Sequence, residues 1–337
     1  MVRLKDIAQR ANVSVMTVSK VLRDAKDISA QTKLRVRKLA EEMGYVPDAL
    51  AQSMRSGTTK LMGLIIPSVA NPVFARVILA IEEKAHEAGY DLLIAHSLNK
   101  PEREESAIRR MLARRVDGLF IVPTYRFAST SQGWDELRRR AVPTVVLGQP
   151  TDFCRGFANV ETDDIFASQI ATRHLLELGH KRIAFLKGPP SSPIAQERFD
   201  GYTKAMREEG FEPDDRLIFA AGQTIEEGST AALQIMNERP DITALIAFND
   251  LVAIGAASTF LQQGVKIPGE LSIVGFGNIL ISEHFRVPLT TIRLPKLRLG
   301  IAAFDQLVRM MRGEKPASVR LAAEIVVRDS TGEPKKG

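Results

Sequence analysis

The sequence predicts a small all-α head followed by an α/β core of doubly wound parallel sheets, long enough for two lobes. Three observations lead to this fold class. The excess of positive charge lies at the front of the chain, and two short helix patterns in the same region meet at an asparagine. From residue 61 onward, short apolar runs alternate with helical stretches. The 337 residues suffice for roughly two or three domains.

The net charge of +6 is confined to the first 60 residues. They contain 12 Lys or Arg and 6 Asp or Glu, out of 46 and 40 in the whole chain, so residues 61–337 carry 34 of each sign. A solvated basic helix face is the simplest interpretation of such a segment. Segregation this complete favours an electrostatic surface for a polyanion.

Two short helices are expected at residues 4–11 and 15–22. Their apolar residues recur at helical spacing; they are Leu4, Ile7, Ala8 and Ala11 in the first helix and Val18, Val21 and Leu22 in the second. Asn12 tolerates the left-handed conformation of a tight turn, and Ser14 can cap the second helix. Met16 and Lys20 point away from the buried stripe of that helix.

A third helix follows, with Ser29 as its cap and Gly44 at its end. The arrangement matches a helix-turn-helix, whose second helix enters the major groove of DNA. A plain three-helix bundle is the alternative. The local excess of basic residues favours DNA binding.

The runs LKDIAQRANVSVMTVSKVL and GYVPDALAQSMRSGTT resemble the head of the lactose-repressor (LacI/GalR) family of transcription regulators. The resemblance extends along nearly the whole chain. It implies base-reading positions at Val15, Met16 and Lys20, with phosphate contacts nearby from Ser14, Thr17 and Ser19. Apolar side chains suit thymine methyl groups, and a lysine reaches a guanine edge. The family more often has arginine at the Lys20 position, and lysine lacks its bidentate fork.

Residues 47–60 form either a flexible linker or a hinge helix. The helix-permissive stretch before Gly57 is too short to be stable alone, since roughly 12–15 residues are marginal in water. The resemblance implies a helix that forms only on DNA, paired with its copy in a second subunit. In that role Ala51 contacts the DNA and Met54 wedges between base pairs in the minor groove.

The core repeats a strand-helix unit. Its apolar runs include LMGLIIP, GLFIVP and LSIVGF, and several helices stop at a glycine that leads into the next strand. This pattern predicts parallel sheets with ligands at the carboxyl ends of the strands. The resemblance implies a two-lobed, periplasmic-binding-protein-like core in which the chain crosses between lobes near Val160, Thr291 and Ala322. The expected domains are residues 1–46, residues 47–60, residues 61–160 with 292–322, and residues 161–291 with 323–337.

Polar and aromatic residues just past four strands are candidates for an effector site. They are Ser68, Asn71, Phe74, Arg198, Asn249, Asp250 and Phe276. Taken singly, Asn71 also suits a turn, Asp250 a helix cap and Phe276 the core. All four segments match effector-contact segments of the family. Arg198 is the leading candidate, because its fork suits vicinal oxygens, a carboxylate or a phosphate.

Two glycines depart from the family pattern. Gly148 and Gly277 stand where many members carry aspartate. The absence of these two aspartates beside Arg198 favours an anionic ligand, such as a sugar acid or a phosphate, over a neutral sugar. Loss of the effector response is the alternative.

Other classes of protein have less support. The chain shows no phosphate-binding or nucleophile-elbow motif, and its five histidines lack metal-ligand spacing, so neither an enzyme nor a cofactor is expected. A secreted binding protein would share the two lobes but lack the head.

One cysteine and no apolar run of about 18 residues indicate the cytoplasm. The expected partners are a palindromic operator, a small-molecule effector and a second copy of the chain, since the tail lacks leucine heptads for a tetramer.

Overall fold

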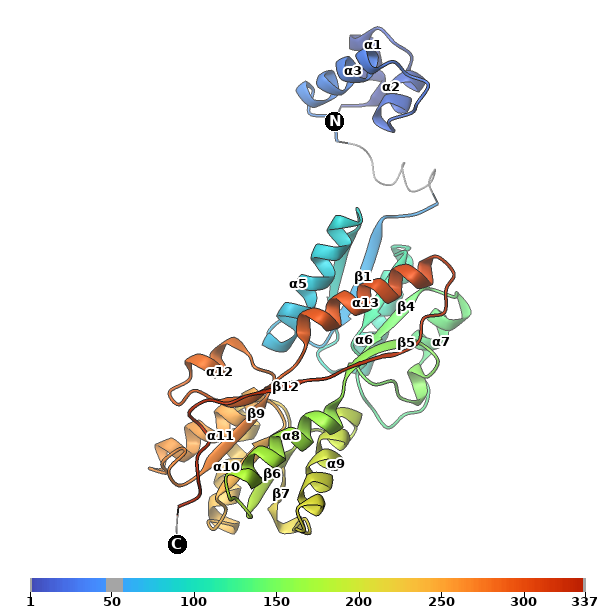
Figure 1. Cartoon of the computed structure of the whole chain (residues 1–337). Coiled ribbons are helices and arrows are strands. Elements are labelled where there is room, and N and C mark those ends of the chain that lie inside the picture. Colours follow the sequence, from blue (N-terminus) through green and yellow to red (C-terminus); the bar gives the residue numbers. More distant parts are fainter. Residues whose placement is uncertain (1, 47–56, 336–337) are drawn as a thin grey trace. The chain divides into compact units, whose positions relative to one another are not determined.

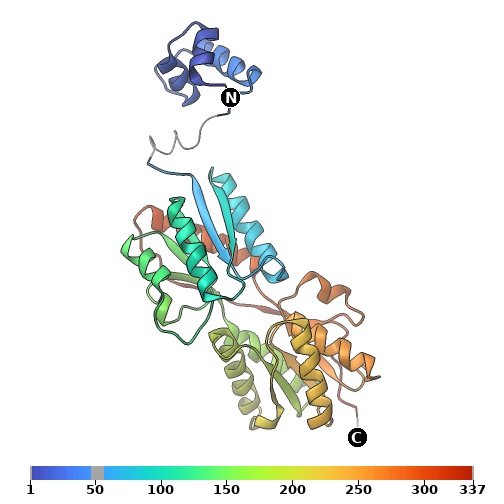
Figure 2. The same ribbon diagram turned by 180° about the vertical axis from the view of Figure 1, so that it is seen from behind.

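The computed structural model describes residues 2–46 and 57–335. The chain divides into two compact units, Met1–Thr59 and Lys60–Gly337, which we describe one at a time as the head and the core. Figure 1 and Figure 2 show the three helices of the head and the two α/β lobes of the core.

The head contains helices α1 (Leu4–Ala11), α2 (Val15–Leu22) and α3 (Ala30–Glu42). The turn between the first two is the one predicted. Asn12 adopts the left-handed conformation with a φ of 52°, and the Ser14 hydroxyl accepts a hydrogen bond from the Thr17 amide at 3.0 Å. The buried core of the head consists of Ile7, Ala8, Ala11, Val18, Val21, Val36 and Ala40. The helix-turn-helix expectation is confirmed.

The first lobe of the core is a six-stranded parallel sheet in the order β11-β5-β4-β3-β1-β2. Its strands are β1 (Leu61–Ile66), β2 (Asp91–His96), β3 (Gly118–Ile121), β4 (Thr144–Leu147), β5 (Ala158–Thr162) and β11 (Val319–Leu321). Alternate residues of a strand point to opposite faces. Leu64 therefore packs towards α5 (Pro72–Glu87) and α13 (Lys296–Met311), and Ile65 towards α6 (Pro101–Ala113) and α7 (Gln132–Arg139).

The second lobe has a six-stranded sheet in the order β12-β10-β9-β8-β6-β7, in which β12 pairs antiparallel with β10 and the other pairings are parallel. Its strands are β6 (Ile183–Lys187), β7 (Ile218–Ala220), β8 (Ala244–Ala247), β9 (Ser272–Phe276), β10 (Thr290–Arg293) and β12 (Glu324–Val326). Helices α8 (Asp164–Glu177) and α9 (Pro193–Glu208) cover one face. Helices α10 (Ile225–Glu238) and α11 (Asp250–Gln262) cover the other. Short helices η1 (Asp152–Cys154), η2 (Asp215–Leu217) and α12 (Leu280–His284) complete the core.

The chain crosses between the lobes three times, after β5, after β10 and after β11. Residue 160 lies inside β5, residue 291 lies inside β10, and residue 322 directly follows β11. The first two strands thus continue two residues past the expected boundaries, to Thr162 and Arg293. The family resemblance therefore places each of these two crossings within two residues of the end of its strand.

The C-terminal tail is hydrogen-bonded to the second sheet. The Ser330 hydroxyl donates to the Ile273 carbonyl at 2.6 Å and accepts from the Thr290 amide at 2.8 Å. Ser330 is almost fully buried. The tail is therefore part of the second lobe and bonds to β9 and β10 near their amino-terminal ends.

Candidate ligand cavity and DNA-reading helix

The outer face of α2 carries exposed side chains at the start of the helix. Val15 is 44% exposed and Met16 is 68% exposed, which is high for apolar residues, and Ser14 beside them is also exposed. Thr17, Ser19 and Lys20 are half-buried. An exposed apolar pair at a helix N-terminus within a basic unit is suited to base edges in a major groove.

Lys20 makes an ion pair that the sequence did not predict. Its Nζ lies 2.5 Å from Asp27 Oδ2, and a hydrogen bond from Lys20 lowers the pKa of that carboxyl. Contact of Lys20 with a guanine edge therefore competes with its ion pair to Asp27. Ala51 and Met54, the expected hinge contacts, lie outside the described residues.

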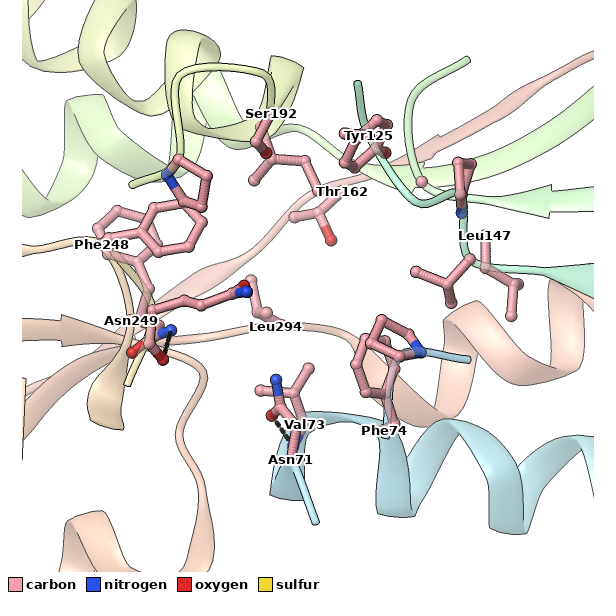
Figure 3. Close-up of a pocket in the computed structure, with 18 of the residues that line it drawn as sticks. Asn71, Val73, Phe74, Tyr125, Leu147, Thr162, Ser192, Phe248, Asn249 and Leu294 are labelled. Atoms are coloured by element: carbon pink, nitrogen blue, oxygen red, sulfur yellow. Dashed lines mark hydrogen bonds between the residues drawn. The ribbon is translucent and has the colours of Figure 1, made fainter. Parts of the chain in front are cut away.

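The core contains a cavity of about 710 Å³ to which both lobes contribute. Its walls come from loops at the carboxyl ends of strands in both sheets, as the doubly wound fold predicts. Figure 3 shows Asn71, Phe74, Tyr125 and Thr162 from the first sheet's side facing Ser192, Phe248 and Asn249 across it. The volume suits a small metabolite.

Six of the seven candidate effector residues line this cavity: Ser68, Asn71, Phe74, Arg198, Asn249 and Phe276. Two of them also hold the backbone. Asn71 accepts from the Val73 amide at 3.1 Å and caps α5, and Asn249 accepts from the Val252 amide at 2.8 Å and caps α11. The local and the ligand-binding interpretations of these asparagines therefore coexist.

Asp250 does not line the cavity, and this part of the expectation is wrong. Its carboxylate turns into the second lobe, where it accepts from Thr291 Oγ1 at 2.5 Å, Ser282 Oγ at 2.7 Å and the Ile279 amide at 2.9 Å. Gly275 leaves room for it, since a Cβ there would collide with the carboxylate. Asp250 is a buried structural acceptor because it follows the capping residue and points into the helix-sheet interface.

Arg198 lines the cavity, and two of its three guanidinium nitrogens already donate hydrogen bonds to the protein. Its Nε donates to Asp164 Oδ1 at 2.7 Å, and Nη1 donates to the Phe248 carbonyl. The guanidinium also lies 4.5 Å from the centre of the Phe276 ring. Burial raises the pKa of Asp164, and Arg198 opposes that shift. The arginine is as much a buried structural group as a ligand contact.

The two unusual glycines have structural partners. A Cβ at Gly148 would lie 2.7 Å from the Tyr125 hydroxyl, which donates to the Gln149 carbonyl at 3.1 Å. A Cβ at Gly277 would lie 3.2 Å from Asp250 Oδ2. Both glycines have positive φ, 123° and 137°, where a side chain is strained. Tyr125 and Asp250 therefore lie beside the two positions at which an aspartate side chain would begin.

Sequence reasoning missed two glutamates in the cavity wall. Glu161 comes from β5 and Glu197 from α9, so each lobe supplies one. Arg320 joins them, because its Nη2 lies 2.8 Å from Glu197 Oε2 and its Nη1 lies 3.3 Å from Glu161 Oε1. Arg320 Nη2 also pairs with Asp163 at 3.1 Å. Three chain segments distant in sequence meet here, and no local pattern signals their meeting.

Two kinds of feature are absent from the part of the chain that the structure describes. Residues 2–46 and 57–335 contain no cluster of three or more His, Cys, Asp or Glu side chains arranged to hold a metal ion. None of their helices combines the length and apolarity that crossing a bilayer demands.

Comparison with known proteins matches both units. Residues 3–48 match the profile of bacterial regulatory proteins of the lacI family. Residues 59–328 match that of periplasmic binding proteins and the sugar binding domain of the LacI family.

Individual relatives agree with these profiles. The chain is 30% identical over 339 residues to the HTH-type transcriptional repressor PurR of Actinobacillus pleuropneumoniae serotype 3 (strain JL03), covering 98% of each protein. It is 31% identical over 331 residues to the HTH-type transcriptional repressor CytR of Escherichia coli (strain K12), covering 97% of this chain and 96% of the relative. The solved Lac repressor dimer, bound to operator and the anti-inducer ONPF, is similar in fold, with a TM-score of 0.87 and 27% identity over 98% of this chain and 99% of that one.

Proposed function

This chain belongs to the lacI family of bacterial regulatory proteins, and we infer that it is a transcriptional repressor whose affinity for a palindromic operator is controlled by a small molecule in the cavity of its core. Membership of the family makes the chain a DNA-binding repressor with a two-lobed α/β core. The operator, the effector and the direction of its control are the proposal.

The head reads DNA through α2. Exposed Val15 and Met16 contact base edges, Lys20 reaches a guanine after leaving Asp27, and hydroxyl groups near the start of the helix contact phosphates. The observations that support this are the exposure of the two apolar side chains and the local excess of positive charge. Ala51 and Met54 serve as hinge contacts in the minor groove, as the family resemblance implies.

The cavity holds the effector. The single observation that carries this assignment is that both lobes supply its wall, so a ligand inside it contacts both at once. A ligand that binds one lobe arrangement more tightly than another shifts the population of the two. Such a shift changes the spacing of the segments that lead from two cores to two heads, and thereby the operator affinity.

The active form is a homodimer in the cytoplasm. A palindromic site requires two heads related by a two-fold axis. The solved operator complex of the Lac repressor, which contains a dimer, supports this assembly by similarity.

Two alternatives lead to different experimental outcomes. A transport-type binding protein would bind a ligand but no specific DNA, and an effector-independent regulator would bind DNA with an affinity that no ligand changes. Selection of DNA sequences from a random pool, followed by titration of the selected operator with and without ligand, distinguishes all three. The proposal requires a palindromic consensus and a change in operator affinity of about 5- to 150-fold on saturation with ligand.

A further inference from the structure

The charges around the cavity point to the class of ligand that it takes. Arg198 is the one Lys or Arg among the described residues that line it, against three carboxylates, Glu161, Asp164 and Glu197. Arg320 and Asp163 extend the same network, giving four carboxylates and two guanidinium groups. With every carboxylate ionised, either count gives a formal net charge of two negative units.

Most of the guanidinium nitrogens in this network already donate hydrogen bonds to the protein. Two of the three guanidinium nitrogens of Arg198 donate to Asp164 and to the Phe248 carbonyl. Arg320 divides its hydrogen bonds among Glu161, Asp163 and Glu197. An incoming carboxylate or phosphate would have to compete with these carboxylates at short range, where like charges repel strongly.

The carboxylates themselves are suited to accept hydrogen bonds from a ligand. Burial raises the pKa of both Glu161 and Glu197, and Arg320 opposes the shift. An ionised carboxylate offers about four lone-pair sites. Glu161 accepts from Asn159 and Arg320, and Glu197 accepts from Gln149 and Arg320, which leaves sites for donors in the cavity.

The rest of the lining is largely apolar. It includes aromatic and aliphatic side chains from both lobes, namely Val73, Phe74, Leu147, Phe248, Leu251, Phe276, Leu294 and Leu299. Such a wall packs against a ring or a carbon skeleton and provides no counter-charge.

We propose that the effector is an uncharged small molecule with hydrogen-bond donors, which bonds to Glu161 of the first lobe and Glu197 of the second. This inference rests on the proposed function, because it concerns the same cavity. It reverses the sequence-based expectation of an anionic ligand. The glycines at 148 and 277 add no open space for an anion, since the Tyr125 hydroxyl and Asp250 Oδ2 lie 2.7 and 3.2 Å from where a Cβ would stand.

The test uses the full-length protein and pairs of compounds that differ in charge. Isothermal titration compares the ribonucleosides with their 5′-monophosphates, and D-glucose and D-ribose with their phosphate esters and with D-gluconate. We expect the tightest binder to be uncharged, and its phosphate ester to bind about 100-fold more weakly or worse. An anionic compound as the tightest cavity ligand would overturn the inference.

Two variants locate the recognition. Glu197→Gln should weaken the neutral ligand about tenfold, because a charge-assisted hydrogen bond becomes a neutral one. The double variant Glu161→Gln/Glu197→Gln should bring the phosphate ester to within about tenfold of the neutral compound. Glu208→Gln is the matched control, since Glu208 lies on the same helix and pairs with Arg173 at the surface. Full affinity for the neutral ligand in both cavity variants would contradict the assignment.

Operator titrations run in parallel separate this inference from the function on which it rests. An anion that occupies the cavity and changes operator affinity contradicts the inference and leaves the proposed function standing. A cavity ligand that leaves operator affinity unchanged contradicts the proposed function.

Discussion

Arg198→Ala should destabilise the second lobe as well as impair ligand binding. The Arg198–Asp164 pair joins two side chains that are each 7% exposed, at 2.7 Å. Removing the arginine leaves a buried carboxylate without its cation and removes the contacts with the Phe248 and Phe276 rings. Loss of one partner of a buried ion pair costs about 3–5 kcal/mol. For a unit of this size that corresponds to a fall in Tm of roughly 6–20 °C.

The loss of stability caused by Arg198→Ala should depend on pH. Burial raises the pKa of Asp164 above 3.8, and Arg198 is the largest opposing influence. Without Arg198 the folded-state pKa rises further, so the folded variant holds a proton that the unfolded chain releases. Its stability is therefore lost as pH rises from about 3.8 through the folded pKa. The difference in Tm from the wild type should shrink as pH falls from 7 towards 5.

The assay is thermal unfolding followed by circular dichroism at pH 7 and pH 5. Asp164→Asn combined with Arg198→Ala should recover much of the loss at pH 7, because no charge remains buried. Arg173→Ala, which breaks the exposed pair with Glu208, is the control and should lower Tm only slightly. A fall of less than about 3 °C for Arg198→Ala at pH 7, or no recovery in the double variant, would refute the reasoning.

Three further predictions concern other parts of the chain. Met16→Ala and Lys20→Ala should each change the base preferred at one operator position, measured by sequence selection, and unchanged profiles in both would argue against α2 as the reading helix. Gly148→Asp should cost about 1–3 kcal/mol in urea unfolding, because φ is 123° and the new Cβ meets the Tyr125 hydroxyl; the same substitution should cost less in a Tyr125→Phe background if that collision is the cause. Ser330→Ala should cost about 1–3 kcal/mol, because two buried backbone groups lose their partner, and an unshifted urea midpoint would show that the tail is dispensable.

Much of the fold was predictable because its signals are local. Asn12 and Ser14 each act through neighbouring residues of their own turn, so the residue types alone predict the helix-turn-helix. The apolar runs of the core predict buried parallel strands for the same reason. The boundaries near residues 160 and 291 come from the family resemblance, and β5 and β10 each continue two residues further, since a strand continues as long as its neighbour pairs with it.

The cavity was only partly predictable because its chemistry depends on which segments meet. Asn71 and Arg198 follow strands, and that position indicates the ligand edge of the sheet. Asp250 also follows a strand, but its direction is set by Gly275 and by donors from distant loops. Glu161 and Glu197 carry no local signal, and their role depends on Arg320, which lies more than a hundred residues further along the chain.

The threefold crossing of the chain has a consequence for biosynthesis. The first lobe begins at β1, yet its edge strand β11 and its covering helix α13 lie at the other end of the chain. Between β5 and β11 the ribosome makes the whole of the second sheet except β12, a span of roughly 160 residues. At a synthesis rate of about 5–20 residues per second this takes roughly 8–30 s. Until α13 is made, late in that interval, Val160 and the other buried residues that pack with Phe304 and Leu307 lack this covering helix on the nascent chain. The lobe that is started first therefore gains its covering helix and its edge strand only after most of the second lobe has been made.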